Sequence, residues 1–203
     1  MSHLKNEDRL MRMAKKKPLI TGDEKIAVFG AGGQIGSKIL PELERHYPGH
    51  VLACDFGKPG YYDVSVTNKG DVRKFIKEHN VKVIINLAAL LSGAAENNPK
   101  KAHEINYLAP RDVMEIASEE GVRKVMTMSS IAAQEFDKRL YESEEAQEAR
   151  TELQKKAPTG AHFAARSSYG QSKTAIEADS RYYTAHRGIQ AHAPRLAGVL
   201  TCY

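Results

Sequence analysis

The amino-acid sequence predicts an α/β fold in which helices cover both faces of a parallel sheet, a doubly wound arrangement. Strands are expected at residues 26–29, 81–87 and 122–128, and the short apolar run at 26–29 is typical of a strand buried on both faces. Amphipathic helical patterns at 68–80 and 99–120 lie between these strands. Strands that alternate with helices in this way connect into a parallel sheet.

Composition and charge exclude several classes of protein. The chain has 203 residues, enough for one domain with a sizeable core, and a net charge of +5 that is spread along it. Because no basic stripe alternates with aromatic residues, we expect no binding to nucleic acid. Two cysteines and eight scattered histidines predict neither a disulfide framework nor a metal site. No apolar stretch reaches the length of a membrane span, and we expect no membrane contact.

The first 24 residues are polar and rich in lysine, and they carry no pattern of a core. We therefore expect a disordered tail over 1–24, outside a single domain at 25–203. The leucines and methionines of this tail alternate with basic residues, so an organelle-targeting segment is the alternative. Glu7 and Asp8 count against targeting, because transit peptides are poor in acidic residues. The expected compartment is the cytoplasm, with the mitochondrion as the alternative.

A glycine-rich turn follows the first apolar run and leads into a helical pattern at 37–46. Gly30, Gly33 and Gly36 recur here at every third position. Glycines allow the backbone to turn tightly and to approach a pyrophosphate, and the free N–H groups at the start of the helix attract its charge. The turn is therefore interpreted as the phosphate cradle of a dinucleotide site, with an ordinary strand-to-helix turn as the alternative.

A second strand is expected at 50–55 and ends in Asp55, about 20 residues after the glycine turn. At this place in dinucleotide folds, a carboxylate accepts hydrogen bonds from the ribose hydroxyls of adenosine and repels a 2′-phosphate. We therefore expect NAD rather than NADP as the cofactor, with an ordinary surface aspartate as the alternative. A brief third strand is expected at 61–64.

The strand at 81–87 is followed by small residues at 88–93, which leave room for a cofactor across the carboxyl edge of the sheet. A long helix is expected at 99–120, because a proline opens it and a glycine follows it. The next strand, at 122–128, delivers Ser130 just beyond its end.

A charged segment at about 134–165 interrupts this regular pattern. It is dominated by Glu, Lys, Gln and Arg, and a solvated helix is expected within it at 142–156. Regular structure resumes with a helix at 168–186 and a strand at 189–195. The segment is therefore treated as an insertion in the domain.

Tyr169 and Lys173 are one helical turn apart, so their side chains project from the same face of the helix. A phenol ionises near pH 10, and a lysine ammonium close to it favours the phenolate and lowers its pKa. Ser130, at the end of the preceding strand, can hold a substrate hydroxyl or carbonyl. These three residues are the candidate catalytic set for oxidising a secondary alcohol with transfer of hydride to a nicotinamide.

The order of these motifs resembles that of the extended short-chain dehydrogenase/reductase family, which also contains the nucleotide-sugar epimerases. The resemblance covers residues 26–203. Within the superfamily, six short stretches resemble the short-chain type of L-threonine 3-dehydrogenases. These stretches are 33–37, 40–43, 86–93, 96–99, 129–132 and 195–198.

The resemblance implies oxidation of L-threonine at its β-carbinol to 2-amino-3-ketobutyrate, with reduction of NAD. Tyr169 would be the base, Ser130 would orient the hydroxyl, and Lys173 would lower the pKa of Tyr169 and bind the nicotinamide ribose. Ser92 would contact the amino acid, and Asn106 would support the site from its helix. The implied contacts to NAD are Gly30, Gly33, Gln34, Ile35 and Gly36 at the pyrophosphate, Asp55 at the ribose, Asp63 and Val64 at the adenine, and Leu87, Ala88 and Ala89 at the middle of the cofactor. Asn106, Tyr169 and Lys173 complete the implied cofactor-binding set.

The resemblance also implies a homodimer. Two long helices of each subunit, here at 99–120 and 169–186, would pair into a four-helix bundle.

Three departures from the family pattern bear on the substrate side of the site. The segment between the strand-end serines and the 168–186 helix is about a dozen residues longer than is usual in the family. The chain also stops after 195–198, where family members continue into the substrate lobe, and Leu196-Ala197 replaces the Tyr-Pro expected beside the nicotinamide. We therefore expect an intact cofactor half and a substrate lobe that is largely missing. The alternative functions are a nucleotide-sugar epimerase or dehydratase, or a non-catalytic NAD-binding remnant.

Overall fold

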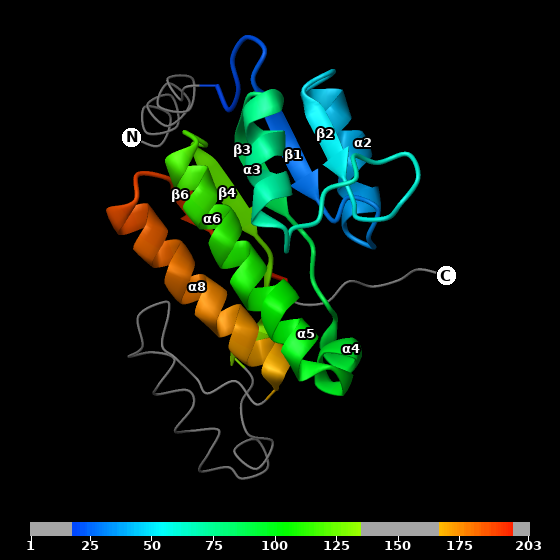
Figure 1. Cartoon of the computed structure of the whole chain (residues 1–203), viewed down its shortest axis with the longest axis vertical. Coiled ribbons are helices and arrows are strands. Elements are labelled where there is room, and N and C mark those ends of the chain that lie inside the picture. Colours follow the sequence, from blue (N-terminus) through cyan, green and yellow to red (C-terminus); the bar gives the residue numbers. More distant parts are fainter. Residues whose placement is uncertain (1–17, 135–166, 197–203) are drawn as a thin grey trace, which may run out of the picture.

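The computed structural model describes residues 18–134 and 167–196. Five parallel strands form one sheet in the order β2-β1-β3-β4-β6, which confirms the predicted parallel sheet (Figure 1). These strands are β1 (Lys25–Phe29), β2 (Val51–Cys54), β3 (Val81–Asn86), β4 (Lys124–Thr127) and β6 (Gln190–His192). A second, two-stranded pairing joins β5 (Ser129–Ser130) to β7 (Arg195–Leu196), again in parallel.

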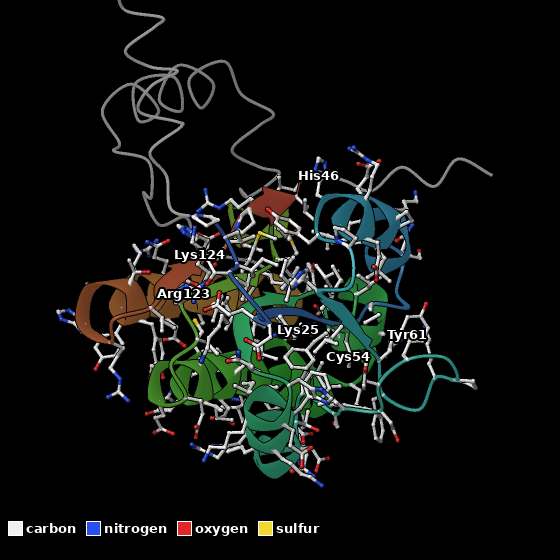
Figure 2. The ribbon with its side chains drawn as sticks, turned by 90° about the horizontal axis from the view of Figure 1, so that it is seen from above. Lys25, His46, Cys54, Tyr61, Arg123 and Lys124 are labelled. Atoms are coloured by element: carbon white, nitrogen blue, oxygen red, sulfur yellow. The ribbon has the colours of Figure 1, made fainter. Side chains whose placement is uncertain are left out.

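Helices cover both faces of the sheet, so the arrangement is doubly wound as predicted. Figure 2 looks down on the layers, with α2 on one side of the sheet and α3 and α6 on the other. Helices α6 and α8 pack against each other and lie side by side (Figure 1). The helices named here are α2 (Gly36–His46), α3 (Lys69–Glu78), α6 (Ala109–Glu119) and α8 (Ser168–His186), and shorter ones are α4 (Ser92–Asn97), α5 (Pro99–His103) and the 3₁₀ segment η2 (Ile131–Gln134).

Strand β1 lies at the centre of the core, with both of its faces buried. Ala27 and Phe29 belong to the cluster under α3, α6 and α8, whereas Ile26 and Val28 belong to the cluster on the α2 face. None of these four side chains is more than 1% exposed. This is why β1 has the uninterrupted apolar sequence from which a strand buried on both faces was predicted.

The predicted long helix forms without a break, but its middle is a π-helical turn, η1 (Glu104–Leu108). The N–H of Ala109 donates to the carbonyl of Glu104, five residues earlier. Pro110, near the start of α6, has no N–H to donate to the carbonyl of Asn106, so the regular α-helical pattern cannot continue through this turn. The sequence analysis did not anticipate the π-turn.

The amino-terminal boundary of the domain differs from the expectation, because residues 18–24 belong to the folded part. Leu19 and Ile20 pack against the apolar cluster on the α2 face of the sheet. Arg123 forms a bidentate ion pair with Glu24 and donates to the carbonyl of Leu19 at 2.9 Å. Residues 18–24 are therefore part of the folded domain, and residues 1–17 lie outside the described part of the chain.

The brief third strand expected at 61–64 is reduced to one bridge between Cys54 and Tyr62. The N–H of Tyr62 donates to the carbonyl of Ala53 at 2.9 Å, and the chain then leaves the edge of the sheet. Figure 2 labels Cys54 and the neighbouring Tyr61 at this edge. The expectation of a strand was therefore wrong, because the pairing ends after a single residue.

The last helix and strand of the described chain follow the sequence prediction closely. Helix α8 covers the expected 168–186, and Gly188, with a φ of 72°, follows its end. The single strand expected at 189–195 is divided into β6 and β7, with Pro194 between them. The helix expected at 142–156, and the charged insertion that contains it, lie outside the described residues.

Candidate active site

The carboxyl ends of the strands meet at one edge of the sheet, where two adjoining cavities open. The first cavity has a volume of about 490 Å³ and the second about 470 Å³. Gly30, Gly33, Leu87 and Ala89 line both, so the glycine turn and the segment after β3 form a shared wall. Of the other predicted site residues, the first cavity is lined by Asp55, Val64 and Ala88, and the second by Gln34, Ile35, Gly36, Ser130, Tyr169 and Lys173.

The backbone of the glycine turn lies so close to neighbouring backbone that side chains would not fit at two of its positions. The absence of side chains also lets the backbone approach a phosphate group. Gly30 has a φ of 73°, and a Cβ there would lie 2.7 Å from the amide nitrogen of Ala88. A Cβ on Gly36 would collide with the carbonyl of Ala31. No side chain caps the N-terminus of α2, so the first turn of this helix presents its backbone to the second cavity.

Asp55 lies at the end of the first cavity next to the glycine turn. Its Oδ2 accepts a hydrogen bond of 2.9 Å from the N–H of Gly32, and its side chain is 19% exposed. The ammonium of Lys58 lies 3.5 Å from the same oxygen and donates to the carbonyl of Gly32 at 2.6 Å. Asp55 therefore lies at the first cavity, and its contact with the ribose hydroxyls stays a prediction. Lys58, which the sequence analysis did not single out, lies beside it.

The two residues predicted to contact adenine are placed differently. Val64 is buried and lines the first cavity. The side chain of Asp63 accepts a hydrogen bond from the N–H of Gly57 at 2.9 Å and closes the turn after β2. Asp63 is not among the residues that line either cavity. Its contact with adenine stays a prediction.

Two asparagines fix the segment that follows β3, which forms the shared wall of the cavities. Asn106, fully buried in the π-turn, accepts from the N–H of Leu90 at 2.7 Å and donates to its carbonyl at 2.9 Å. Asn86 accepts from the N–H of Ala88 at 3.1 Å. Asn106 thus holds this segment in place but lines neither cavity, and its predicted part in binding the cofactor stays a prediction. Asn86 was not proposed, although a polar residue that ends an apolar strand was a visible signal for it.

Tyr169, Lys173 and Ser130 meet in the second cavity. The Lys173 ammonium lies 5.4 Å from the centroid of the Tyr169 ring and donates to the carbonyl of Met128 at 2.8 Å. Ser130 and Tyr169 line the same cavity, and the hydroxyl of Ser130 accepts from the N–H of Ala132 at 3.2 Å. Helix α8 supplies the tyrosine and the lysine, and β5 supplies the serine.

The ionisation of this trio differs from the sequence-based expectation. Burial raises the pKa of Tyr169, and the hydrogen bond from Ser130 opposes this shift without reversing it. Burial also lowers the pKa of Lys173 to about 8. The expectation that the lysine lowers the pKa of Tyr169 was therefore wrong for the protein without its cofactor. The removal of both groups from water has the larger effect.

Several residues around the second cavity were missed at the sequence level. Leu91, Met128 and Leu196 give it an apolar wall. Apolar residues in loops carry no recognisable signal of their own, and only the folded chain places them together. The predicted substrate residue Ser92 is the first residue of α4, directly after Leu91.

Within residues 18–134 and 167–196, no group of three or more His, Cys, Asp or Glu side chains is arranged to hold a metal ion. The helices of this described part are also too short or too polar for any of them to cross a membrane.

The family of the chain follows from a comparison with family models. The chain belongs to the NAD dependent epimerase/dehydratase family, whose model matches residues 26–200. NAD is thus the cofactor, and the glycine turn, Asp55 and the two adjoining cavities fit it. The parallel sheet and the two cavities at its carboxyl edge agree with this family.

Curated relatives carry only a general description. An uncharacterized epimerase/dehydratase from Staphylococcus saprophyticus is 27% identical over 188 residues, which is 88% of this chain and 54% of the relative. A similar protein from Staphylococcus haemolyticus matches with the same identity and coverage. The chain thus spans about half the length of the curated relatives it matches.

Solved structures give a more specific likeness. The chain resembles L-threonine dehydrogenase from Clostridium difficile with a TM-score of 0.71 and 28% identity, over 87% of this chain and 54% of the other. The holo form of a GalE-like L-threonine dehydrogenase from Cupriavidus necator gives 0.68 and 27%, over 84% and 53%. A UDP-glucose 4-epimerase from Thermus thermophilus, in complex with NAD, gives 0.67 at 20% identity, over 84% and 54%, which supports the fold alone.

Proposed function

We propose that this chain is the cofactor-binding part of an NAD-dependent dehydrogenase that oxidises L-threonine to 2-amino-3-ketobutyrate. The observation that carries the proposal is the meeting of Ser130, Tyr169 and Lys173 in the cavity that also borders the glycine turn. The choice of threonine among secondary alcohols is supported by the threonine dehydrogenases that are 27% and 28% identical to the chain.

In this proposal the chain binds and orients two molecules side by side. The glycine turn and the start of α2 hold the pyrophosphate, and Asp55 accepts the adenosine ribose hydroxyls. Lys173, which lines the second cavity, would bind the nicotinamide ribose through its ammonium. Bound NAD supplies the acceptor for the hydride that leaves the β-carbon of threonine.

The protein residues handle the proton of the threonine hydroxyl. Ser130 orients this hydroxyl towards Tyr169, whose phenolate oxygen takes the proton. Because burial raises the pKa of Tyr169, the phenolate is scarce at neutral pH in the free protein. The hydrogen bond from Ser130 and the positive charge of Lys173 both favour the phenolate. Oxidation should therefore become faster as the pH rises from neutral, for as long as Lys173 keeps its proton.

Deuterium transfer tests the proposed reaction. L-Threonine labelled with deuterium at its β-carbon should give NADH that carries the label, and Tyr169→Phe should abolish the transfer. If UDP-galactose and UDP-glucose are interconverted while threonine gives no NADH, the protein is an epimerase instead. If NAD binds and neither substrate changes, it is a non-catalytic NAD-binding module.

A homodimer through the long helices is part of the proposal. The outer surface of α6 and α8 carries a cavity lined by aromatic residues and by charges of both signs. Arg111 and Arg187 lie there with Glu115 and Asp179, and one carboxylate oxygen of Asp179 is buried without a hydrogen-bond partner in the described part of the chain. A second copy related by a two-fold axis would bring opposite charges together on this surface. The proposed compartment is the cytoplasm.

A further inference from the structure

Helix α8 carries a third buried polar residue in line with the catalytic pair. Tyr169, Lys173 and Glu177 follow one another at intervals of four, so they occupy one face of the helix. Glu177 is 8% exposed, and it has no part in the chemistry proposed above. A buried carboxylate is costly unless its oxygens are paired, so its partners indicate what it does.

The partners of Glu177 come from the two short strands at the second cavity. Oε1 accepts from the hydroxyl of Ser129 at 2.6 Å and from Nε of Arg195 at 2.6 Å. Oε2 accepts from Nη2 of Arg195 at 2.5 Å. Burial by itself would raise the pKa of Glu177, but the hydrogen bonds from Arg195 and Ser129 outweigh it and lower the pKa. The carboxylate is thus ionised and fully used in binding β5 and β7.

The strands that Glu177 joins are too short to hold their own position. β5 and β7 are two residues each, and their register pairs Ser129 with Arg195 and Ser130 with Leu196. In each strand, the first residue binds Glu177 and the second lines the second cavity, which Ser129 also borders. A displacement of either strand would therefore move Ser130 or Leu196 relative to Tyr169.

We propose that Glu177 is a positioning residue that clamps β5 and β7 to α8, so that Ser130 and Leu196 face Tyr169 across the second cavity. The inference rests on the proposed function for its catalytic consequence. Glu177 lies about two helical turns after Tyr169 on α8. By holding the two strands to this helix, it fixes the distance from Ser130 to Tyr169. Displacement of a catalytic group by about 1 Å can lower a rate by about a hundredfold.

The clamp acts through geometry. Burial is the cause of the lowered pKa of Lys173, and no charge contributes to it. The guanidinium of Arg195 neutralises the carboxylate of Glu177 in a bidentate pair. Replacing Glu177 should therefore change positions in the site rather than the pKa of Lys173.

Glu177→Gln is the test variant, because glutamine keeps the size and an acceptor for Ser129 but loses the ion pair with Arg195. Arg195→Lys is a second variant that keeps the charge and loses the bidentate geometry, in case the first folds poorly. Glu120→Gln is the matched control. Glu120 is also a mostly buried carboxylate, with a side chain that is 13% exposed, but it pairs with Arg73 and Lys77 far from the cavities.

Three measurements on the full chain separate the possible outcomes. Deuterium uptake by peptides that cover 127–134 and 188–196 should rise at least about fivefold in Glu177→Gln and Arg195→Lys, and stay unchanged in Glu120→Gln. The Kd for NAD should stay within about twofold of wild type, because the adenosine end is held by other elements. With L-threonine, kcat should fall by about tenfold or more.

Unchanged uptake in both clamp variants would overturn the clamp, whatever the activity. Equal losses in NAD affinity and kcat would overturn a positioning role, because they would indicate general loosening of the fold. If the wild-type protein does not oxidise threonine, the proposed function fails, while the exchange measurement still decides whether Glu177 holds the two strands.

Discussion

Lys173 shows at the scale of one residue how the site combines support and chemistry. Its ammonium is bound to the carbonyl of Met128 at 2.8 Å, and it also lies against the ring of Tyr169. The first contact fixes the end of β4 to α8, and the second brings a positive charge to the candidate base. Because Lys173 is buried, its ammonium form is less stable than in water, and its pKa is lowered.

Tyr169→Phe removes the hydroxyl of the proposed base and leaves the ring that lines the cavity. We expect the rate of threonine oxidation to fall by about a hundredfold or more, because no other described group can take the proton. The Kd for NAD should remain within about twofold of wild type. Calorimetric titration and steady-state kinetics measure the two quantities, and a variant that keeps its turnover would exclude Tyr169 as the base.

Lys173→Met tests the lowered pKa of the lysine through stability. In the folded protein this pKa is about 8, against about 10.5 when unfolded, so between these values the unfolded chain binds more protons. The stability of wild type should therefore rise with pH in this window, by at most about 3 kcal/mol, and this rise should be absent in the variant. Urea unfolding of both proteins from pH 7 to pH 10 measures it, and parallel curves would contradict the shift.

Asp55→Ala tests which cofactor the first cavity selects. Without the carboxylate, Lys58 is free to pair with a 2′-phosphate, so the preference for NAD over NADP should fall by about tenfold. Asp71→Ala, in the exposed first turn of α3, is the control and should keep the preference. An unchanged ratio of the two Kd values in Asp55→Ala would remove the ribose role from this residue.

At the scale of elements, the site depends on how short segments are tied to the ends of strands. The π-turn η1 carries Asn106 under the segment after β3, and α8 carries Glu177 under β5 and β7. In both cases a polar side chain on a helix holds a short segment at the ends of the strands. The cavities therefore keep their shape without a regular element on every side.

Asn106→Ala should loosen the segment after β3 and weaken cofactor binding. The change leaves the N–H and carbonyl of Leu90 without their partners, and we expect a loss of about 2 kcal/mol in unfolding free energy. The Kd for NAD should rise by about fivefold or more, because this segment lines both cavities. Chemical unfolding and NAD titration provide the two values.

Asn68→Ala is the control for this prediction. Asn68 caps α3 by accepting from the N–H groups of Gly70 and Asp71, away from the cavities. Its loss should cost about 1 kcal/mol of stability and leave the Kd for NAD unchanged. A similar loss of NAD affinity in both variants would mean that lowered stability, and not the position of Leu90, weakens binding.

The sequence predicted the elements well where apolar periodicity decides them. β1 and β3 are almost continuous apolar runs whose side chains are buried on both faces of the sheet, and the glycine turn follows β1 directly. The π-turn was not predicted, because the apolar pattern of 99–120 is that of one continuous helix. The turn is explained by the missing N–H of Pro110, which interrupts the α-helical hydrogen bonds. Leu91 and Leu196 could not be predicted as cavity residues, since their place depends on contacts between distant segments.

The sequence was least informative about electrostatics. Spacing put Tyr169 and Lys173 on one face of α8 and thereby predicted a lowered tyrosine pKa. The structure gives the opposite shift for the free protein, because burial of the phenol raises its pKa by more than Ser130 lowers it. Desolvation depends on everything packed around a group, and local spacing does not record it.

At the scale of the whole molecule, β6 is one edge strand of the described sheet. The outward backbone groups of its central residue, Ala191, are already hydrogen-bonded. The hydroxyl of Thr184, on α8, binds both the N–H and the carbonyl of Ala191, at 2.9 and 3.0 Å. These are the groups that an added strand would use at that residue. The surface of α6 and α8 therefore offers a better place for a second copy than the sheet edge does.

Tyr182→Arg tests the proposed dimer. Tyr182 is 53% exposed on the outer surface of α8 and would be buried by a second copy. A new positive charge beside Arg111 and Arg187 should repel the partner and shift the protein to monomers, with a Kd for dimerisation raised by about tenfold or more. Sedimentation velocity measures the shift. Phe56→Arg, at an exposed position away from these helices, should leave the dimer intact, and equal behaviour of the two variants would contradict the interface.

The most direct test of the central claim is the absorbance of NADH when purified protein, NAD and L-threonine are mixed. We predict NADH formation that depends on threonine, is lost in Tyr169→Phe, and is accompanied by saturable binding of NAD in a separate titration. Saturable binding of NAD without any NADH from threonine would contradict the claim, and would leave a cofactor-binding protein whose catalytic trio does not oxidise this amino acid.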